Sequence, residues 1–167
     1  MVLSPLLHGL RNFPLYLRAM TDLGLDTHSL ATAMGKAYAI MHWGAGINGD
    51  DVEFVLGTSL LLTEGTNSHR DVQNRAVGMY LLDFGQCNAV NLQEDPDIVY
   101  QAFKGTMVTD NNQSYIPNCR TSPALFQSFR DGYLQAGRVV LEQKGLEERF
   151  SIEEFLGQYD EYSEDFL

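Results

Sequence analysis

The spacing of apolar residues predicts two helices in the first part of the chain. Between Asp26 and His42 the apolar positions recur at three- and four-residue steps, and Asp26 is suited to cap the helix. These positions are Leu30, Ala33, Met34, Ala37, Ile40 and Met41. A shorter helix is expected before it, opening at Pro14 and ending near Gly24, because proline suits a first turn and glycine suits the residue after a last one.

Two shorter apolar runs predict strands. The run from Val52 to Leu56 alternates and stops at Gly57, and the run 78–84 is apolar and aromatic. We expect the two runs to pair as a short β-hairpin. The polar segment 57–77 is expected to be a flexible insertion, because a connection of that length is either functional or mobile.

The remainder of the chain has helical periodicity. Helices are predicted over 96–103 and over 122–144, the second stopped by Gly145. Ser151 and Glu154 match a capping box, which predicts a last helix with its apolar residues turned inward. Those residues are Ile152, Phe155, Leu156 and Tyr159. The pattern therefore predicts an α+β fold, mostly α, with about five to six helices and one short β-hairpin.

The length of the chain predicts a single domain, and its cysteine content favours a reducing compartment. The chain has 167 residues, 44% of them hydrophobic, with no repeat or linker, so we expect one domain over 1–167. Cys87 and Cys119 are too few and too far apart for a disulfide framework. No stretch has the length of a signal peptide core or a membrane helix, so the expected compartment is the cytoplasm, with the nucleus left open and no membrane partner.

The net charge of −11 is concentrated near the C-terminus. Segment 142–167 carries nine acidic residues against Lys144 and Arg149, which gives −7 there. Such a surface repels phosphate backbones and argues against nucleic acid as a partner. We expect this segment to be a solvated acidic helix and tail.

The glycines Gly44, Gly46 and Gly49 satisfy the pattern G-x-G-x-x-G. A dinucleotide-binding loop requires the order strand, glycines, helix, so that the pyrophosphate lies at the helix N-terminus. Here the glycines follow a helix and precede a strand, which disfavours a phosphate-binding loop.

The order helix, glycine loop, strand also occurs in another class of protein. A helix ends at His42, a loop and the strand 54–56 follow, and a second strand ends in Asp83-Phe84-Gly85. In this respect the chain resembles the C-terminal lobe of protein kinases and aminoglycoside phosphotransferases. It is also similar, from Leu10 to about Leu141, to a fungal family of unknown function whose members are often labelled zinc finger proteins. The sequence segments that carry this similarity are LRNFPLYL, AMGKAYAIMHWGAGINGDDVEFVLG and LLDFGQC. The histidines and cysteines form no pair at zinc-ligand spacing.

The kinase-like resemblance implies roles for four carboxylates. Asp83 would bind magnesium, with Asp51 or Glu53 as the second metal ligand. Because Gly44 stands where the catalytic Asp of H-R-D is expected, Asp50 would be the catalytic base.

Each candidate also has a structural interpretation. Asp50 can anchor a turn, Asp83 can cap local amides beside a Gly85 of positive φ, and His42 can be a core histidine. A nominal set of Cys87, His42 and Asp83 has no feature that would lower the thiol pKa.

The expected function is a non-catalytic interaction module, similar to a pseudokinase. A glycine-rich loop and a phosphate-binding lysine do not precede the resemblance, so half of a nucleotide pocket is absent. Exposed apolar surface near Phe13, Leu15 and Trp43 would bind a protein partner or a second copy. The alternative is a fragment of a magnesium-dependent small-molecule phosphotransferase that needs a separate nucleotide lobe. A shortened or truncated gene product without activity of its own is the third interpretation.

Overall fold

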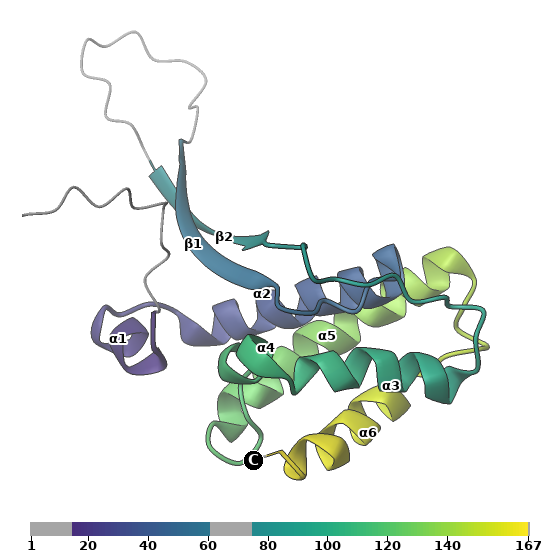
Figure 1. Ribbon diagram of the computed structural model, residues 1–167. Coiled ribbons are helices and arrows are strands. Elements are labelled where there is room, and N and C mark those ends of the chain that lie inside the picture. The colour runs from purple at the N-terminus through teal and green to yellow at the C-terminus, as the bar shows by residue number, and fades with distance from the viewer. Residues whose placement is uncertain (1–14, 61–74, 167) are drawn as a thin grey trace, which may run out of the picture.

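The computed structural model describes residues 15–60 and 75–166, and within them the fold is α+β and mostly α (Figure 1). The described elements are α1 (Leu17–Asp22), α2 (Thr27–Ala39), the π-helical turn η1 (Ile40–Ala45), β1 (Glu53–Leu60), β2 (Arg75–Leu82), α3 (Pro96–Met107), α4 (Asp110–Tyr115), α5 (Pro123–Lys144) and α6 (Ile152–Glu164). Six α-helices and one antiparallel hairpin in the described part confirm the predicted class. Helix α4 was not predicted. None of the described helices has both the length and the apolar character required to cross a membrane.

The predicted starts of α2 and α6 are confirmed by their caps, whereas α1 begins at Leu17 and α3 continues to Met107, beyond the predicted end at residue 103. A carboxylate oxygen of Asp26 accepts a hydrogen bond from the Ser29 amide at 3.0 Å. The Ser151 hydroxyl likewise accepts from the Glu154 amide at 3.2 Å. In a full capping box the Ser151 backbone amide would donate a hydrogen bond to the Glu154 side chain. Here it donates to the Tyr100 hydroxyl at 2.9 Å. Tertiary contact has therefore replaced one half of the local motif.

Helices α2 and α5 lie side by side and carry the closest packing of the fold (Figure 1). Gly35 faces the backbone of α5, where an added Cβ would lie 2.0 Å from the Phe129 carbonyl oxygen. Gly132 does the same in reverse, with an added Cβ 2.1 Å from the Thr32 carbonyl oxygen. The two glycines thus allow direct backbone contact between the helices.

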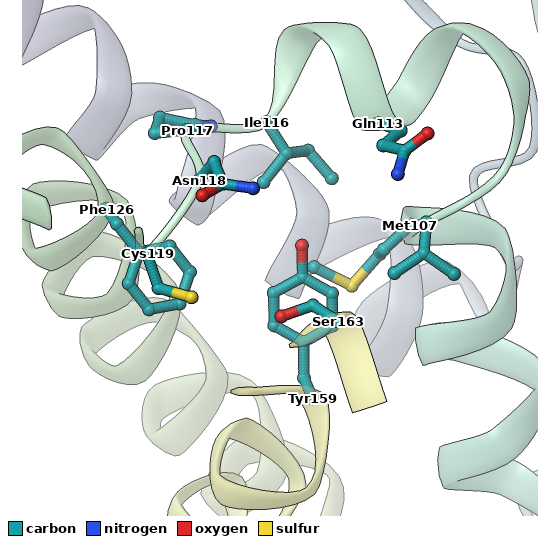
Figure 2. Close-up of a pocket in the computed structure, with 10 residues that line it drawn as sticks. Met107, Gln113, Ile116, Pro117, Asn118, Cys119, Phe126, Tyr159 and Ser163 are labelled. Carbon is teal, nitrogen blue, oxygen red and sulfur yellow. The ribbon is translucent and has the colours of Figure 1, made fainter. Parts of the chain in front are cut away.

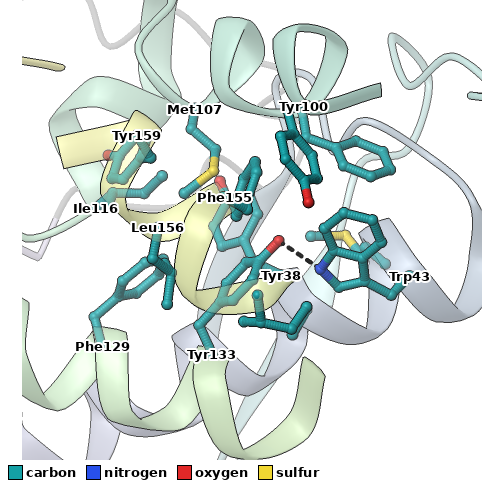
Figure 3. Close-up of a cluster of buried hydrophobic side chains, with 14 of the residues drawn as sticks. Tyr38, Trp43, Tyr100, Met107, Ile116, Phe129, Tyr133, Phe155, Leu156 and Tyr159 are labelled. Atoms are coloured by element: carbon teal, nitrogen blue, oxygen red, sulfur yellow. Dashed lines mark hydrogen bonds between the residues drawn. The ribbon is translucent and has the colours of Figure 1, made fainter. Parts of the chain in front are cut away.

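The core is an aromatic cluster where η1, α3, α5 and α6 meet (Figure 3). Trp43 is fully buried and packs edge-on against Phe103 and Phe155 at centroid distances of 5.1 and 5.7 Å. The prediction that Trp43 contributes exposed apolar surface is therefore wrong. Its indole is held in the core by Tyr133, to whose hydroxyl it donates a hydrogen bond at 3.0 Å. Leu15 is exposed as predicted, and Phe13 lies outside the described residues.

The two strands are longer than the sequence predicted. Glu53 pairs with Leu82 and Leu60 pairs with Arg75, so residues 57–60 and 75–77 belong to the ladder. The prediction of a flexible insertion is wrong for these residues, and 61–74 lie outside the described part. Phe54 and Leu81 share one face of the hairpin and pack on the core. The base of the hairpin is therefore anchored to the helices, and Figure 1 shows both strands extending away from them.

The acidic C-terminal segment is a packed helix. In place of the expected solvated tail, α6 buries Ile152, Phe155, Leu156, Tyr159 and Ser163, while its glutamates are exposed. Several of them pair with arginines, as in the ion pair between Glu164 and Arg120 at 3.0 Å. One face of α6 is therefore part of the core, as the apolar periodicity after the predicted capping box indicated.

Candidate functional site

The loop between η1 and β1 is fixed by hydrogen bonds to three other segments: the backbone of Asn88 and the side chains of Thr106 and Asn112. The Asn48 side-chain oxygen accepts from the Asn88 amide at 2.8 Å, and the Thr106 hydroxyl donates to the Asn48 carbonyl at 2.6 Å. The Asn112 side-chain amide donates to the Gly49 carbonyl at 2.9 Å from a fully buried position. Asn48 and Asn112 were missed by sequence reasoning. The only local signal was Asn48-Gly49, which is typical of a turn.

The loop and the hairpin place the backbone positions of the four predicted carboxylates at one end of the hairpin. Asp50 and Asp51 end the loop, Glu53 begins β1, and Asp83 follows β2. Because Glu53 pairs with Leu82, the carboxylates of the first strand and Asp83 flank the same end of the hairpin. Asp51 and Asp83 have φ values of +53° and +57°. Among the residues that the structure describes, they are the non-glycine residues with a positive φ. Aspartate tolerates this left-handed conformation better than most residues do.

The individual contacts show how each aspartate is held. One Asp83 oxygen accepts from the Gly85 amide at 3.4 Å, which agrees with the capping interpretation. The expectation that Gly85 has a positive φ is wrong, since Asp83 itself takes that conformation. One Asp51 oxygen accepts from the Gln86 side-chain amide at 2.6 Å. Asp50 was expected to anchor the turn that follows Gly49. The side chain that anchors this turn is Asn48, whose oxygen accepts a hydrogen bond from the Asp50 backbone amide at 3.3 Å.

Cys87 lies against this loop, with its sulfur 3.5 Å from the Asp50 carbonyl oxygen. Burial raises the pKa of the Cys87 thiol, and the negative charges of Asp50 and Asp83 raise it further. A raised pKa disfavours the thiolate that a nucleophile requires. The arrangement therefore argues against nucleophilic catalysis by Cys87.

His42 is a core residue. It is fully buried, stacks on Phe103 at a centroid distance of 4.2 Å, and its Nδ1 lies 2.7 Å from the Tyr133 hydroxyl. The Trp43 indole donates a hydrogen bond to the same hydroxyl at 3.0 Å, so Tyr133 links the two side chains. Burial lowers the His42 pKa to about 3, against a smaller opposite effect of the Asn48 backbone. The core interpretation of His42 is confirmed.

The oxygen donors at the hairpin base are of the type that magnesium prefers. Within residues 15–60 and 75–166, no group of three or more His, Cys, Asp or Glu side chains is arranged to hold a metal ion. A magnesium ion bound by Asp83 with Asp51 or Glu53 stays a prediction.

No family model, curated protein or solved structure matches this chain. The resemblance to the fungal family and to the kinase-like lobe therefore stays a prediction from the sequence segments quoted above.

Proposed function

We propose that this protein is a non-catalytic kinase-like module that binds a protein partner, in the first instance a second copy of itself, through its hairpin. The residue at the opening of the catalytic-loop counterpart, His42, is locked in the core as a neutral imidazole. It cannot reach a substrate or take part in proton transfer.

The observation that carries this proposal is the outer face of the hairpin, defined here as Val55, Tyr80 and Leu82 with the adjoining Phe84. Residues opposite one another in the ladder share a face, and Tyr80 and Leu82 lie on the face opposite to the anchored Phe54 and Leu81. Tyr80, Leu82 and Phe84 expose 43%, 47% and 47% of their surface. The Tyr80 ring covers Gly57 and Gly78, where no side chain would otherwise fill the face.

A two-stranded sheet with an apolar exposed face is marginally stable by itself, and association would cover it. Self-association is measured by sedimentation over a range of protein concentrations, together with fluorescence of a dye that binds apolar surface. We expect a concentration-dependent oligomer, or strong dye binding in the monomer. A monomer at all concentrations that binds no dye would remove the proposal.

Paired variants localise the surface. Replacing Tyr80 and Leu82 by serine is expected to abolish association and dye binding. Ile98→Ser is the matched control, because Ile98 is 58% exposed but lies on α3. Equal effects of the two sets of changes would show that the hairpin face has no special role.

One observation supports the alternative function of a phosphotransferase fragment. Asp51 and Asp83 both adopt the left-handed conformation at the same end of the hairpin, and such strain concentrates at functional sites. Magnesium-ATP at about 100 times its dissociation constant would stabilise the fold by about 2.7 kcal/mol. A thermal shift that disappears in Asp83→Ala would support this function, and no shift at millimolar nucleotide would exclude it.

A further inference from the structure

The cavity between α3, α4, α5 and α6 in the helical body is too small for a ligand (Figure 2). Its volume is about 10 Å³, which is the space of one water molecule. Met107, Ile116 and Tyr159 are among the side chains that close it. The hairpin offers more surface for recognition than this part of the body does.

Each strand of the hairpin has an outer edge to which no described strand is paired. The sheet formed by residues 15–60 and 75–166 contains β1 and β2 alone, joined along their inner edges. The backbone N–H and C=O groups along such an edge are a template for pairing with a strand of another chain.

Exposure favours the edge of β2 over that of β1. Val77 of β2 is 65% exposed, and Tyr80 and Leu82 on the same strand are also exposed. Val55 and Leu56 of β1 are half-buried. A strand that pairs with β2 would therefore cover more apolar surface than one that pairs with β1.

The order of charges along β2 is complementary to itself in the antiparallel direction. When two β2 strands pair about a two-fold axis at Met79, the position of Arg75 in each copy lies next to Asp83 of the other. Opposite charges on facing positions of an antiparallel pair are stabilising. Strand β1 contains Glu53 and no lysine or arginine, so self-pairing of β1 brings no opposite charges together.

The same register leaves room for the largest side chain on the outer face. It places Tyr80 of each copy opposite Gly78 of the other, and glycine has no side chain to obstruct the approach of the two edges. Within each hairpin the Tyr80 ring already lies over the glycine pair, with an added Cβ at Gly57 only 2.9 Å from it.

We propose that two copies, associating through the hairpin as in the proposed function, join their β2 edges into a four-stranded antiparallel sheet in the order β1–β2–β2–β1. Each chain has a formal net charge of −11, which disfavours direct contact between two helical bodies. Both strands extend away from the helices (Figure 1), so antiparallel pairing leaves the two bodies at opposite ends of the sheet.

Cysteine cross-linking locates the paired edge. In the full chain with Cys87 and Cys119 replaced by serine, Met79→Cys places its thiol opposite the same thiol of the second copy. Facing Cα atoms in an antiparallel pair are about 4.5–5.5 Å apart, which a disulfide can bridge. Leu56→Cys is the matched control, because Leu56 faces Met79 in the ladder but lies on β1. The two Leu56 positions would be about 14 Å apart in the paired sheet, three strand spacings.

We expect Met79→Cys to form a disulfide-linked dimer on a non-reducing gel with several-fold higher yield than Leu56→Cys. Sedimentation of the same samples reports association independently of the cross-link. An oligomer without a cross-link at Met79, or with a stronger one at Leu56, would overturn the β2 pairing and leave association through the hairpin face intact. A monomer at every concentration would overturn the pairing, and a monomer that also binds no dye would remove the proposed function with it.

Charge variants test the register without cysteines. Arg75→Glu brings like charges together at both ends of the paired strands and should weaken the association constant about fivefold. Adding Asp83→Asn removes this repulsion and should restore part of the loss, because asparagine tolerates the positive φ at this position. Association that is unchanged in Arg75→Glu, or not restored in the double variant, would overturn the register.

Discussion

At the scale of single residues, three polar aromatic side chains share one buried hydroxyl. The Tyr133 hydroxyl is hydrogen-bonded to His42 Nδ1 at 2.7 Å and accepts from the Trp43 indole at 3.0 Å, and all three side chains are fully buried. A buried polar group is tolerated when its hydrogen bonds are made within the protein. The site that resembles the opening of a catalytic loop is thereby part of the core, and its protonation is coupled to folding.

The His42 pKa predicts a dependence of stability on pH. The pKa is about 3 in the folded protein and has a reference value of 6.5. Below the reference value the unfolded chain binds a proton that the folded chain refuses, so the stability present above pH 6.5 is lost as pH falls toward 3. We expect the free energy of unfolding in urea to fall by about 1.4 kcal/mol per pH unit from this residue alone.

Two histidine variants test this dependence. His42→Gln lowers stability at neutral pH, but it should make the slope between pH 6 and 5 shallower by about one proton. His28→Gln is the control for loss of a histidine from the exposed surface. Identical slopes in wild type and His42→Gln would contradict the burial argument.

The left-handed conformation of Asp83 predicts different stabilities for two small substitutions. Asp83→Ala and Asp83→Gly both remove the carboxylate and its contact with Gly85, but only glycine accepts a positive φ without cost. Asp83→Gly should therefore be more stable than Asp83→Ala by about 1 kcal/mol. Chemical denaturation of the two variants measures the difference. Equal midpoints would mean that the backbone is unstrained there.

At the scale of elements, the pair α2 and α5 shows why glycine inside a helix can be favourable. Glycine lowers helix stability compared with alanine, yet Gly35 and Gly132 lie within long helices. The contact of each with the opposite backbone compensates for that loss, since any side chain would force the helices apart. Helix propensity alone would have counted these residues as unfavourable.

Alanine substitutions distinguish contact glycines from free ones. Gly35→Ala should lower the free energy of unfolding by about 3 kcal/mol or prevent folding, because the new methyl group meets backbone atoms that cannot move aside. Gly157→Ala in α6 is the matched control, with nothing within 4 Å of the added Cβ. That variant should be more stable than wild type by about 0.5 kcal/mol or more. Thermal and urea unfolding compare both changes, and equal effects would contradict the packing described for α2 and α5.

At the scale of the whole molecule, the described chain divides into a helical body and a hairpin that extends from it (Figure 1). The body contains the aromatic core, and the hairpin touches it mainly through Phe54 and Leu81 near its base. A hairpin with so little support should open without unfolding of the helices.

Hydrogen exchange measures this difference in local stability. In the monomer, the amides of α2 and α5 should exchange through global unfolding, and those of β1 and β2 far from the base should exchange faster. Raising the protein concentration should protect the hairpin if copies associate through it. Uniform protection of hairpin and helices at low concentration would show that the strands are supported by more than the contacts at their base.

The sequence by itself determined the local elements. The caps at Asp26 and Ser151, the stop at Gly145 and the two apolar runs each specify an element through contacts within a few residues. They were sufficient for the fold class and for placing Asp51, Glu53 and Asp83 at the ends of the two strands.

Only the tertiary structure shows which polar groups are hydrogen-bonded to partners far away in the sequence. The buried Trp43 indole and the Nδ1 atom of His42 both find a hydrogen-bond partner in Tyr133, 90 and 91 residues away. Asn112 fixes the glycine loop from 63 residues away, and Tyr100 takes over half of the Ser151 capping box from 51 residues away. Partners at such separations are selected by three-dimensional packing, which leaves no periodic trace along the chain.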